Sequence, residues 1–367
     1  MVRFLLTRVG QTIRKAAACA AMATLLLAPA WAGKHAKDSS LQVSGPVLLL
    51  EGGRKLTWER SFSLEREVKP KRAFWTKLVD FAIGEPDFRY MVNPYSVTTD
   101  SRGRIIVTDP GANGVHIFDF AQQKYKFLTR REKDKDFTMT PQCVAVDAQD
   151  NIYVTDSEAG KVFVWDANGK YKRAIGSLKG GEGYFKRPTG IAIDSAAQRI
   201  YITDTLRNKI FVTDMQGSVL QSIGKTGTGD GEFNYPTELR LHGDELAVVD
   251  AMNFRVQVLD RSGTFRYSIG KVGDGSGWMF RPKGISFDSE GHLYVVDGAW
   301  STVQVFNREG QLLYYFGQKG AGPGEFQLPT GLQIDSSDHV YVVDSYNRRV
   351  QIYHYQGLPR QAEEKKP

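Results

Sequence analysis

The sequence predicts an all-β fold, a six-bladed β-propeller of four-stranded antiparallel blades. Three observations lead to this prediction: a repeat of nearly constant length, four short strand patterns inside each repeat, and a last repeat that lacks its fourth strand. The repeats begin at six prolines, Pro94, Pro141, Pro188, Pro236, Pro282 and Pro329, which are 46 to 48 residues apart. Repeats of about 20 to 50 residues are typical of solenoids, propellers and arrays.

The repeat that begins at Pro188 shows the strand pattern most clearly. Its segments 188–194, 199–204, 209–214 and 219–224 are rich in Ile, Val, Tyr and Thr and are bounded by Asp, Asn or Gly. Such segments are typical of short strands joined by tight turns. No stretch of ten or more residues in the repeats has the helical period, so each repeat is expected to form one antiparallel sheet.

The ends of the repeat region predict how the ring closes. The sixth repeat stops after residues 350–354 without a fourth strand, whereas residues 77–84 resemble the fourth strands of the other repeats. We therefore expect an N-terminal strand near residues 75–83 to complete the last blade. The predicted organisation is a signal peptide (1–32), a linker (33–45), an arm (46–72) that contacts the outer blades through Leu56, Trp58 and Phe62, the propeller (73–357) and a disordered tail (358–367).

Two motifs connect this pattern with a known family. Residues 341–352 read Tyr-Val-Val-Asp-Ser-Tyr-Asn-Arg-Arg-Val-Gln-Ile, residues 248–258 are similar, and the loop 320–326 reads Gly-Ala-Gly-Pro-Gly-Glu-Phe. Together they resemble the NHL-repeat family of six-bladed β-propellers, in its secreted bacterial form, over residues 75–356. The resemblance implies the fold and is nearly silent on function, because one fold hosts many activities. The glycine-rich loops lead to a proline and a strand, which indicates turns and not phosphate-binding loops.

The first 32 residues have the layout of a secretory signal peptide. Basic residues at positions 3, 8, 14 and 15 precede an apolar run (16–28) and an Ala-Trp-Ala sequence that ends at Ala32. This layout predicts cleavage near Ala32 and a periplasmic or secreted protein. A retained anchor is the alternative, although the apolar run is shorter than the ~20 residues that a spanning helix needs.

Charge and cysteine content restrict the function classes. The formal charge of +7 falls to +3 without residues 1–32 and to about −1 for the propeller, so no nucleic-acid partner is expected, although some NHL propellers bind RNA through a basic face.

Removal of Cys19 with the signal peptide leaves Cys143 as the single cysteine. It therefore cannot form an intramolecular disulfide, and we expect it to contribute to packing.

Candidate catalytic groups are scarce. An aspartate ends the second strand of every repeat: Asp109, Asp156, Asp204, Asp250, Asp297 and Asp344. Six equivalent carboxylates are expected to accept hydrogen bonds in turns and not to catalyse. The histidines, among them His116, His242, His292 and His339, show no i,i+2 or i,i+4 pairing, and they are expected to occupy different places in their repeats. The sequence therefore predicts no metal site, no cofactor and no catalytic residue.

Departures from the repeat predict the working face. In a propeller of this type the loops between blades and the loops between second and third strands share one face, where ligands usually bind. The side chains predicted to bind a partner there are Arg187, Arg207, Tyr235, Glu238, Arg281, Lys283, Trp300 and Tyr346. Glu238 replaces a glycine of the repeat, so Glu238→Gly is expected to leave folding intact.

These observations favour a monomeric binding or scaffolding module for a protein, peptide or glycan partner of the cell envelope. The alternative is a metal-dependent hydrolase or lyase, similar to lactonases or to amidating lyases of the same fold, with Ca²⁺ or Zn²⁺ at the channel mouth.

Overall fold

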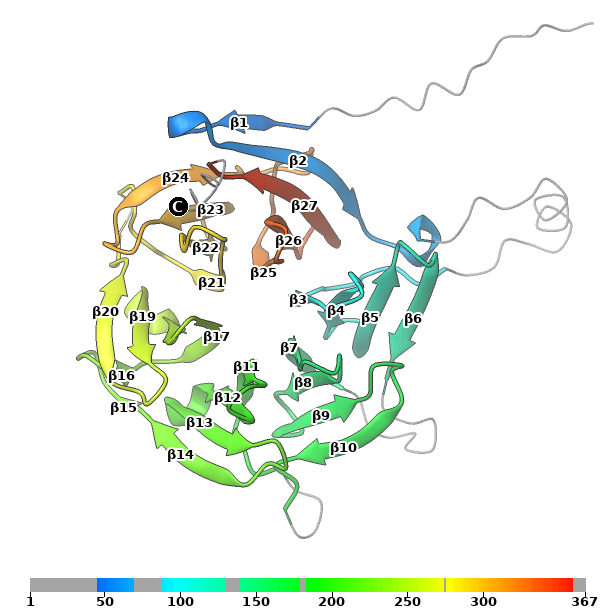
Figure 1. Cartoon of the computed structure of the whole chain (residues 1–367), viewed down its shortest axis with the longest axis vertical. Helices are drawn as coiled ribbons and strands as arrows, with labels where there is room; N and C mark the ends of the chain where they lie inside the picture. Colours follow the sequence, from blue (N-terminus) through cyan, green and yellow to red (C-terminus); the bar gives the residue numbers. More distant parts are fainter. Residues whose placement is uncertain (1–44, 69–87, 130–138, 179–182, 274, 359–367) are drawn as a thin grey trace, which may run out of the picture. The chain divides into compact units, whose positions relative to one another are not determined.

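The computed structural model describes residues 45–68, 88–129, 139–178, 183–273 and 275–358, which all lie in one compact unit, Ser44–Pro367. These residues form strands and short 3₁₀ turns, and the described ranges contain no α-helix. The sheets are arranged as six blades around a central channel (Figure 1). The predicted all-β, six-bladed propeller is therefore confirmed. In the described part of the chain, no helix has the length and apolarity needed to cross a membrane.

Each of the first five blades is a four-stranded antiparallel sheet built from consecutive strands. Blade 1 contains β3 (Ser96–Thr99), β4 (Ile105–Asp109), β5 (Gly114–Asp119) and β6 (Lys124–Leu128). Blade 2 contains β7 (Pro141–Val146), β8 (Ile152–Asp156), β9 (Lys161–Trp165) and β10 (Tyr171–Ile175). Blade 3 contains β11 (Pro188–Asp194), β12 (Arg199–Asp204), β13 (Lys209–Asp214) and β14 (Val219–Ile223). Blade 4 contains β17 (Pro236–His242), β18 (Glu245–Asp250), β19 (Arg255–Asp260) and β20 (Phe265–Ile269). Blade 5 contains β21 (Pro282–Phe287), β22 (Leu293–Asp297), β23 (Thr302–Phe306) and β24 (Leu312–Phe316).

Short elements occupy the connections. The strands β15 (Lys225–Thr226) and β16 (Glu232–Phe233) form a small parallel pair in the loop between blades 3 and 4. Four 3₁₀ turns complete the described structure: η2 (Glu51–Gly53), η3 (Glu65–Glu67), η4 (Thr205–Arg207) and η5 (Ala251–Asn253).

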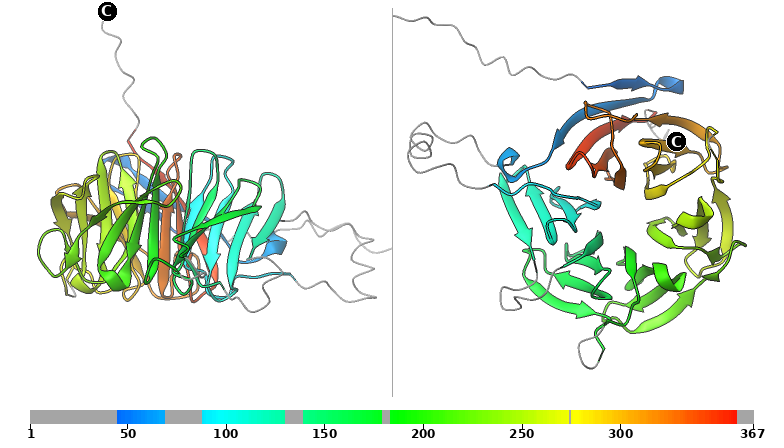
Figure 2. Two further views of the ribbon diagram at one scale, coloured as in Figure 1. Left: turned by 90° about the horizontal axis from the view of Figure 1, so that it is seen from below. Right: turned by 180° about the vertical axis from the view of Figure 1, so that it is seen from behind.

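The sixth blade combines strands from both ends of the propeller. β25 (Pro329–Ile334), β26 (His339–Asp344) and β27 (Arg349–Gln356) are followed in the sheet by β2 (Lys55–Phe62) and then by the short edge strand β1 (Val47–Leu49). Figures 1 and 2 show β2, in blue, beside β27, in red. The prediction that residues 77–84 take this position is wrong, because β2 pairs with β27 from Lys55–Gln356 to Phe62–Val350. Residues 77–84 themselves lie outside the described residues.

The predicted arm is therefore part of the last blade. Leu56 and Phe62 are fully buried, and the indole nitrogen of Trp58 donates a hydrogen bond of 2.8 Å to Gln351. The propeller extends to β1 and β2, beyond the boundary predicted at residue 73. The predicted signal peptide, linker and tail lie outside the described residues, except for Gly45 and Leu358 at their edges.

The hydrophobic core lies between neighbouring blades. Six clusters of buried apolar side chains each join two adjacent blades, and the cluster with Phe62, Val97 and Val343 joins blade 6 to blade 1. This packing follows from the sequence, because each β-rich segment is apolar on both sides and must be covered by a blade on either face. The channel is lined by the first strand of each blade.

The direction of the inner strands defines two faces. Pro188 at the start of β11 is paired with Asp204 at the end of β12, and the amide of Thr205 donates to the Arg187 carbonyl. The loops between blades therefore lie beside the loops between second and third strands. We call this side the loop face and the opposite side, which carries the tight hairpins, the hairpin face.

The repeated aspartates are turn acceptors, as predicted. Asp204 accepts hydrogen bonds from the backbone amides of Lys186 and Arg187, and each of its five equivalents accepts amides of the loop before the inner strand of its own blade. All six are buried. They connect the loop face to the sheets.

The glycine-rich loop 320–326 is also structural. The carboxylate of Glu325 accepts a hydrogen bond of 2.8 Å from the Gly322 amide, and a Cβ atom at Gly320 would lie 2.1 Å from this carboxylate. The loop therefore closes on its own glutamate, and its amides are not arranged around an external phosphate.

Candidate functional site at the channel mouth

One position of the inner strands is restricted to small residues in most blades. Two residues after the repeat proline, the chain carries Ser96, Cys143, Gly190, Glu238, Gly284 and Gly331. A Cβ atom at Gly190 would lie 2.6 Å from the Thr237 carbonyl of the next inner strand, and one at Gly284 would lie 2.5 Å from the Leu332 amide. Glu238 is the large and charged exception, and it is buried in the channel near the loop face.

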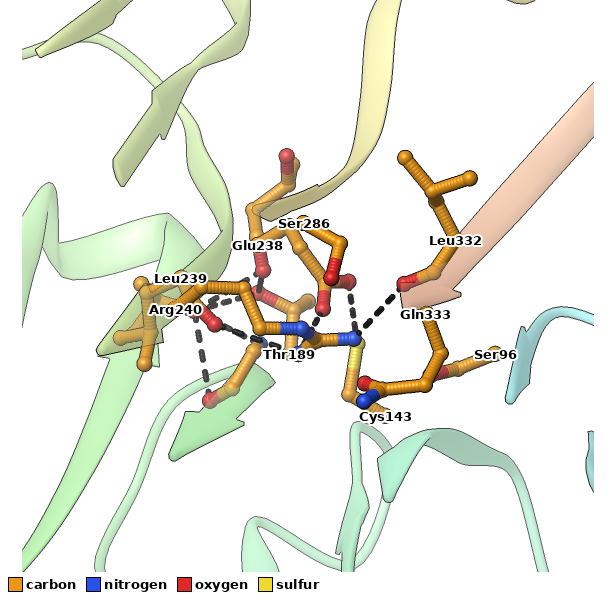
Figure 3. A network of polar contacts seen from close by, with 12 residues as sticks. Ser96, Cys143, Thr189, Glu238, Leu239, Arg240, Ser286, Leu332 and Gln333 are labelled. Atoms are coloured by element: carbon orange, nitrogen blue, oxygen red, sulfur yellow. Dashed lines mark hydrogen bonds and ion pairs between the residues drawn. The ribbon is translucent and has the colours of Figure 1, made fainter. Parts of the chain in front are cut away.

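Glu238 is held by two partners inside the channel (Figure 3). The Cys143 thiol donates a hydrogen bond of 2.8 Å to Oε2 of Glu238, and Nη1 of Arg240 lies 2.5 Å from its Oε1. Arg240 also donates a hydrogen bond of 3.1 Å to the Leu332 carbonyl of β25. Three inner strands are therefore linked across the channel by one buried ion pair.

This ion pair leaves hydrogen-bonding capacity unused. Oε1 of Glu238 and Nε of Arg240 are both buried, and neither has a hydrogen-bond partner among the described residues. Oε1 does lie close to Nη1 of Arg240, but this contact is an ion pair without hydrogen-bond geometry. Unsatisfied buried polar atoms are uncommon in folded proteins.

Arg240 was missed by the sequence analysis, although a signal was present. Four residues after the repeat proline the other blades carry Thr98, Ala145, Ala192, Ser286 and Gln333, none of which is charged. The expectation that Glu238→Gly leaves folding intact has to be revised for the same reason. Removal of the carboxylate would leave a charged Arg240 side chain, 12 % exposed, without its counter-ion.

Three predicted cations form the rim of this site. Lys283 is half-buried, and burial lowers its pKa to about 8, assisted by the nearby positive charges of Arg281 and Arg187. The Arg187 and Arg281 side chains are exposed. None of the three makes an ion pair within the described ranges. Lys283 thus lies close enough to Arg281 and Arg187 to be affected by their charges, and Tyr95 lies close to Glu238, Arg187 and Arg281.

Tyr95 and Cys143 complete the wall of the site. Burial raises the pKa of the Tyr95 hydroxyl, and the neighbouring Cys143 and Glu238 add to this effect. Burial, followed by the charge of Glu238, raises the pKa of the Cys143 thiol well above its usual range. Cys143 is therefore a protonated donor to Glu238. It also packs in the hydrophobic cluster between blades 2 and 3, as predicted.

The remaining predicted residues differ in their surroundings. Trp300 is 46 % exposed and lines a shallow apolar pocket of about 420 Å³ on the loop face with Val272 and Phe280. Tyr235 is partly exposed, and Tyr346 is the most exposed of the predicted aromatic residues at 63 %. Arg207 is exposed, lies 3.6 Å from Asp204 and has its guanidinium over the Tyr184 ring.

The hairpin face has different features. A polar pocket of about 480 Å³ lies between the hairpins of blades 4 and 5. In blade 6, Glu59, His339 and His354 approach one another closely enough to hold a metal ion. The interpretation of the histidines as unrelated was wrong, because His292 and His339 occupy the same place 47 residues apart, each beside an aspartate.

Comparison with known proteins agrees with this architecture. A family model described as "6-bladed beta-propeller" (DUF5128) matches residues 138–199, 192–253 and 281–366, which together exceed half of the chain. The chain belongs to this family. A search of curated proteins found no match.

Solved structures of several functions share the propeller. A gluconolactonase from Xanthomonas campestris is 14 % identical with a TM-score of 0.56, over 85 % of this chain and 98 % of that one. An auxiliary nutrient binding protein from Bacteroides thetaiotaomicron is 11 % identical with a TM-score of 0.57, over 73 % and 70 %. A virginiamycin B lyase from Staphylococcus aureus is 15 % identical with a TM-score of 0.53, over 82 % and 99 %. At these identities the similarity establishes the fold alone, and the neighbours include both binding proteins and enzymes.

Proposed function

We propose that this member of the six-bladed family is a binding module that recognises an anionic or polar group of a protein, peptide or glycan at the channel mouth of its loop face. One observation carries the proposal. Lys283 is half-buried beside two arginines, and none of the three has a carboxylate partner among the described residues. Like charges held together in a partly desolvated place favour an anion, which would relieve their mutual repulsion.

Exposed apolar side chains beside this cluster support a larger partner. Phe280 is 56 % exposed, Val272 is 57 % exposed, and both line the pocket that contains Trp300. Phe280 directly precedes Arg281, so the apolar pocket and the cationic rim are continuous along the chain. Aromatic and arginine side chains in this arrangement are enriched in interface hot spots.

The alternative, a metal-dependent hydrolase or lyase with its ion at the channel mouth, is less compatible with these charges. Arg187, Arg281 and Lys283 would repel a divalent cation at the mouth, and the described carboxylate there, Glu238, is paired with Arg240. An anionic group could bind beside these three cations without separating Glu238 from Arg240.

The proposal also includes the type of repeat and the export of the protein. The motifs in residues 248–258 and 341–352 support an NHL-type repeat, in which Arg349 and Gln351 donate to the buried Asp344. The layout of residues 1–32 supports export to the periplasm or the medium after cleavage near Ala32. Mass spectrometry of protein from the native envelope would test the export, and recovery of a chain with residues 1–32 intact would contradict it.

Immobilised protein offers a test of the binding site with defined probes. Peptides and oligosaccharides that carry a carboxylate would be compared with their amidated or neutral counterparts. We expect only the anionic probes to bind, and we expect Arg281→Ala combined with Trp300→Ala to weaken them by about 2 kcal/mol or more. Lys170→Ala, in a hairpin of the opposite face, is the control. Equal binding of neutral probes, or an equal effect of Lys170→Ala, would refute the proposal.

A further inference from the structure

Two histidines face each other across neighbouring strands of blade 6. His339 begins β26, His354 lies near the end of β27, and the two are direct partners in the antiparallel pairing. Their rings are stacked, with centroids 4.7 Å apart and planes inclined by 20°. Both side chains are about one third exposed, so the pair is accessible from solvent on the hairpin face.

The third member of the group comes from the other end of the propeller. Glu59 is the additional residue of a β-bulge in β2, between the pairs Trp58–Tyr353 and Arg60–Ile352. Bulges often redirect a side chain next to a functional site. One oxygen of Glu59 lies 4.0 Å from Nε2 of His339 and the other lies 3.8 Å from Nδ1 of His354. The three ligand atoms all lie within 4.8 Å of one another.

A fourth residue orients His339. Its Nδ1 lies 3.3 Å from Oδ2 of Asp335, which also accepts a hydrogen bond of 2.9 Å from the Tyr341 hydroxyl. A carboxylate beside Nδ1 places the ring proton there and leaves the Nε2 lone pair directed toward Glu59. This arrangement of carboxylate, histidine and ligand position is the usual second shell of protein metal sites.

Blade 5 shows what the repeat alone provides. His292 and Asp288 stand 47 residues before His339 and Asp335 and form the same contact, at 2.9 Å. The place of His354, however, is taken in blade 5 by Asn307. The pair of His and Asp is therefore a feature of the repeat, whereas the second histidine and the glutamate occur together in blade 6, where β2 joins β27.

We propose that Glu59, His339 and His354 form a binding site for a transition-metal ion, with Zn²⁺ as the best match. Two imidazoles and one carboxylate are a common ligand set for Zn²⁺, which binds them at about 2.0 to 2.2 Å and accepts water as a fourth ligand. Bonds of this length place tetrahedral ligand atoms about 3.3 to 3.6 Å apart. The separations of 4.0 Å and 3.8 Å from Glu59 therefore need to shorten by less than about 1 Å, and the third, within 4.8 Å, by at most about 1.5 Å, which side-chain rotations provide. The ion would connect the N-terminal β2 to the C-terminal β26 and β27.

Titration with zinc tests this site without reference to the partner of the loop face. Protein without a histidine tag, freed of metal by a chelator, would be titrated with ZnCl₂ by calorimetry, and with CoCl₂ to observe the visible absorption of four-coordinate Co²⁺. We expect one equivalent of tight binding and a higher melting temperature with zinc. We expect His354→Gln to weaken zinc at least 100-fold, and Asp335→Asn to weaken it about 10- to 100-fold.

Matched variants separate the site from a general effect of histidine. His292→Gln removes the equivalent histidine of blade 5 and should leave the zinc affinity unchanged. Glu59→Gln keeps the shape of the third ligand, and it should weaken zinc without changing the melting temperature of the metal-free protein. Several weak equivalents instead of one, no Co²⁺ spectrum, or equal losses in His292→Gln and His354→Gln would overturn the proposal.

Discussion

Blades 3 and 4 have the same backbone but line the channel with different side chains. β11 and β17 both begin at a proline that pairs with an aspartate, and both have a register shift between this first pair and the next one. Where β11 carries Gly190 and Ala192, β17 carries the buried Glu238 and Arg240. The comparison shows that a blade of this kind does not need an ion pair in the channel, and we propose that the pair in blade 4 contributes to ligand recognition.

The largest expected effect comes from breaking this pair on one side. Glu238→Ala would leave Arg240 charged and nearly buried beside the Leu332 carbonyl. Loss of one partner of a buried ion pair destabilises a protein by about 3 kcal/mol. Urea unfolding of the parent and the variant would measure this difference. A loss below about 1 kcal/mol would mean that water already screens the pair.

Conversion of blade 4 to the residues of blade 3 should have a smaller effect. Glu238→Gly combined with Arg240→Ala removes both charges, and buried ion pairs can often be replaced without loss of stability. We expect the double variant to lose at most about 1 kcal/mol, mainly from the backbone freedom of the new glycine. The same unfolding experiment, as a double-mutant cycle, would measure the coupling. Purely additive losses would contradict the contrast between the two blades.

Lys283 extends the comparison to blade 5, because blades 3, 4 and 6 carry Thr189, Thr237 and Thr330 at its position. Its pKa falls from 10.5 to about 8 on folding, mainly through burial. The folded state therefore binds this proton less tightly than the unfolded state. Below pH 8 the charged lysine reduces stability, and this penalty disappears as the pH rises from 8 toward 10.5.

The difference in the free energy of unfolding, parent minus Lys283→Thr, should therefore increase as the pH rises from about 8 to 10.5. Bound anion would raise the pKa of Lys283 again, so binding of anionic probes should weaken above pH 8. A difference between parent and Lys283→Thr that does not change with pH would show that Lys283 is solvated like an ordinary lysine.

Cys143→Ser should have the smallest effect of the four changes. Serine stands at the same position in blade 1 as Ser96, and its hydroxyl can replace the thiol as donor to Glu238. We expect a change in stability below about 1 kcal/mol. The native thiol should react slowly with thiol reagents, because it is buried and its pKa is raised. Rapid reaction without denaturant would contradict this description of the channel.

The sequence by itself determined the repeat and the chemistry that each repeat carries along its own strands. The prediction of strands in residues 188–194, 199–204 and 209–214 is confirmed, because alternating β-branched residues and Asp turns are local signals. The grouping of Arg187, Arg281 and Lys283 is likewise a prediction from repeat position, because Arg187 and Arg281 directly precede their repeat prolines and Lys283 directly follows one.

Only the tertiary structure decided which strands and side chains meet across the chain. The sequence pattern of an outer strand is weakly specific, so residues 77–84 matched the pattern expected for the outer strand of blade 6. In the structure, β2 makes the pairing with β27. The groups formed by Glu238, Arg240 and Cys143, and by Glu59, His339 and His354, each combine separate strands. Their distances depend on sheet pairing and ring closure, and local periodicity contains no information on either.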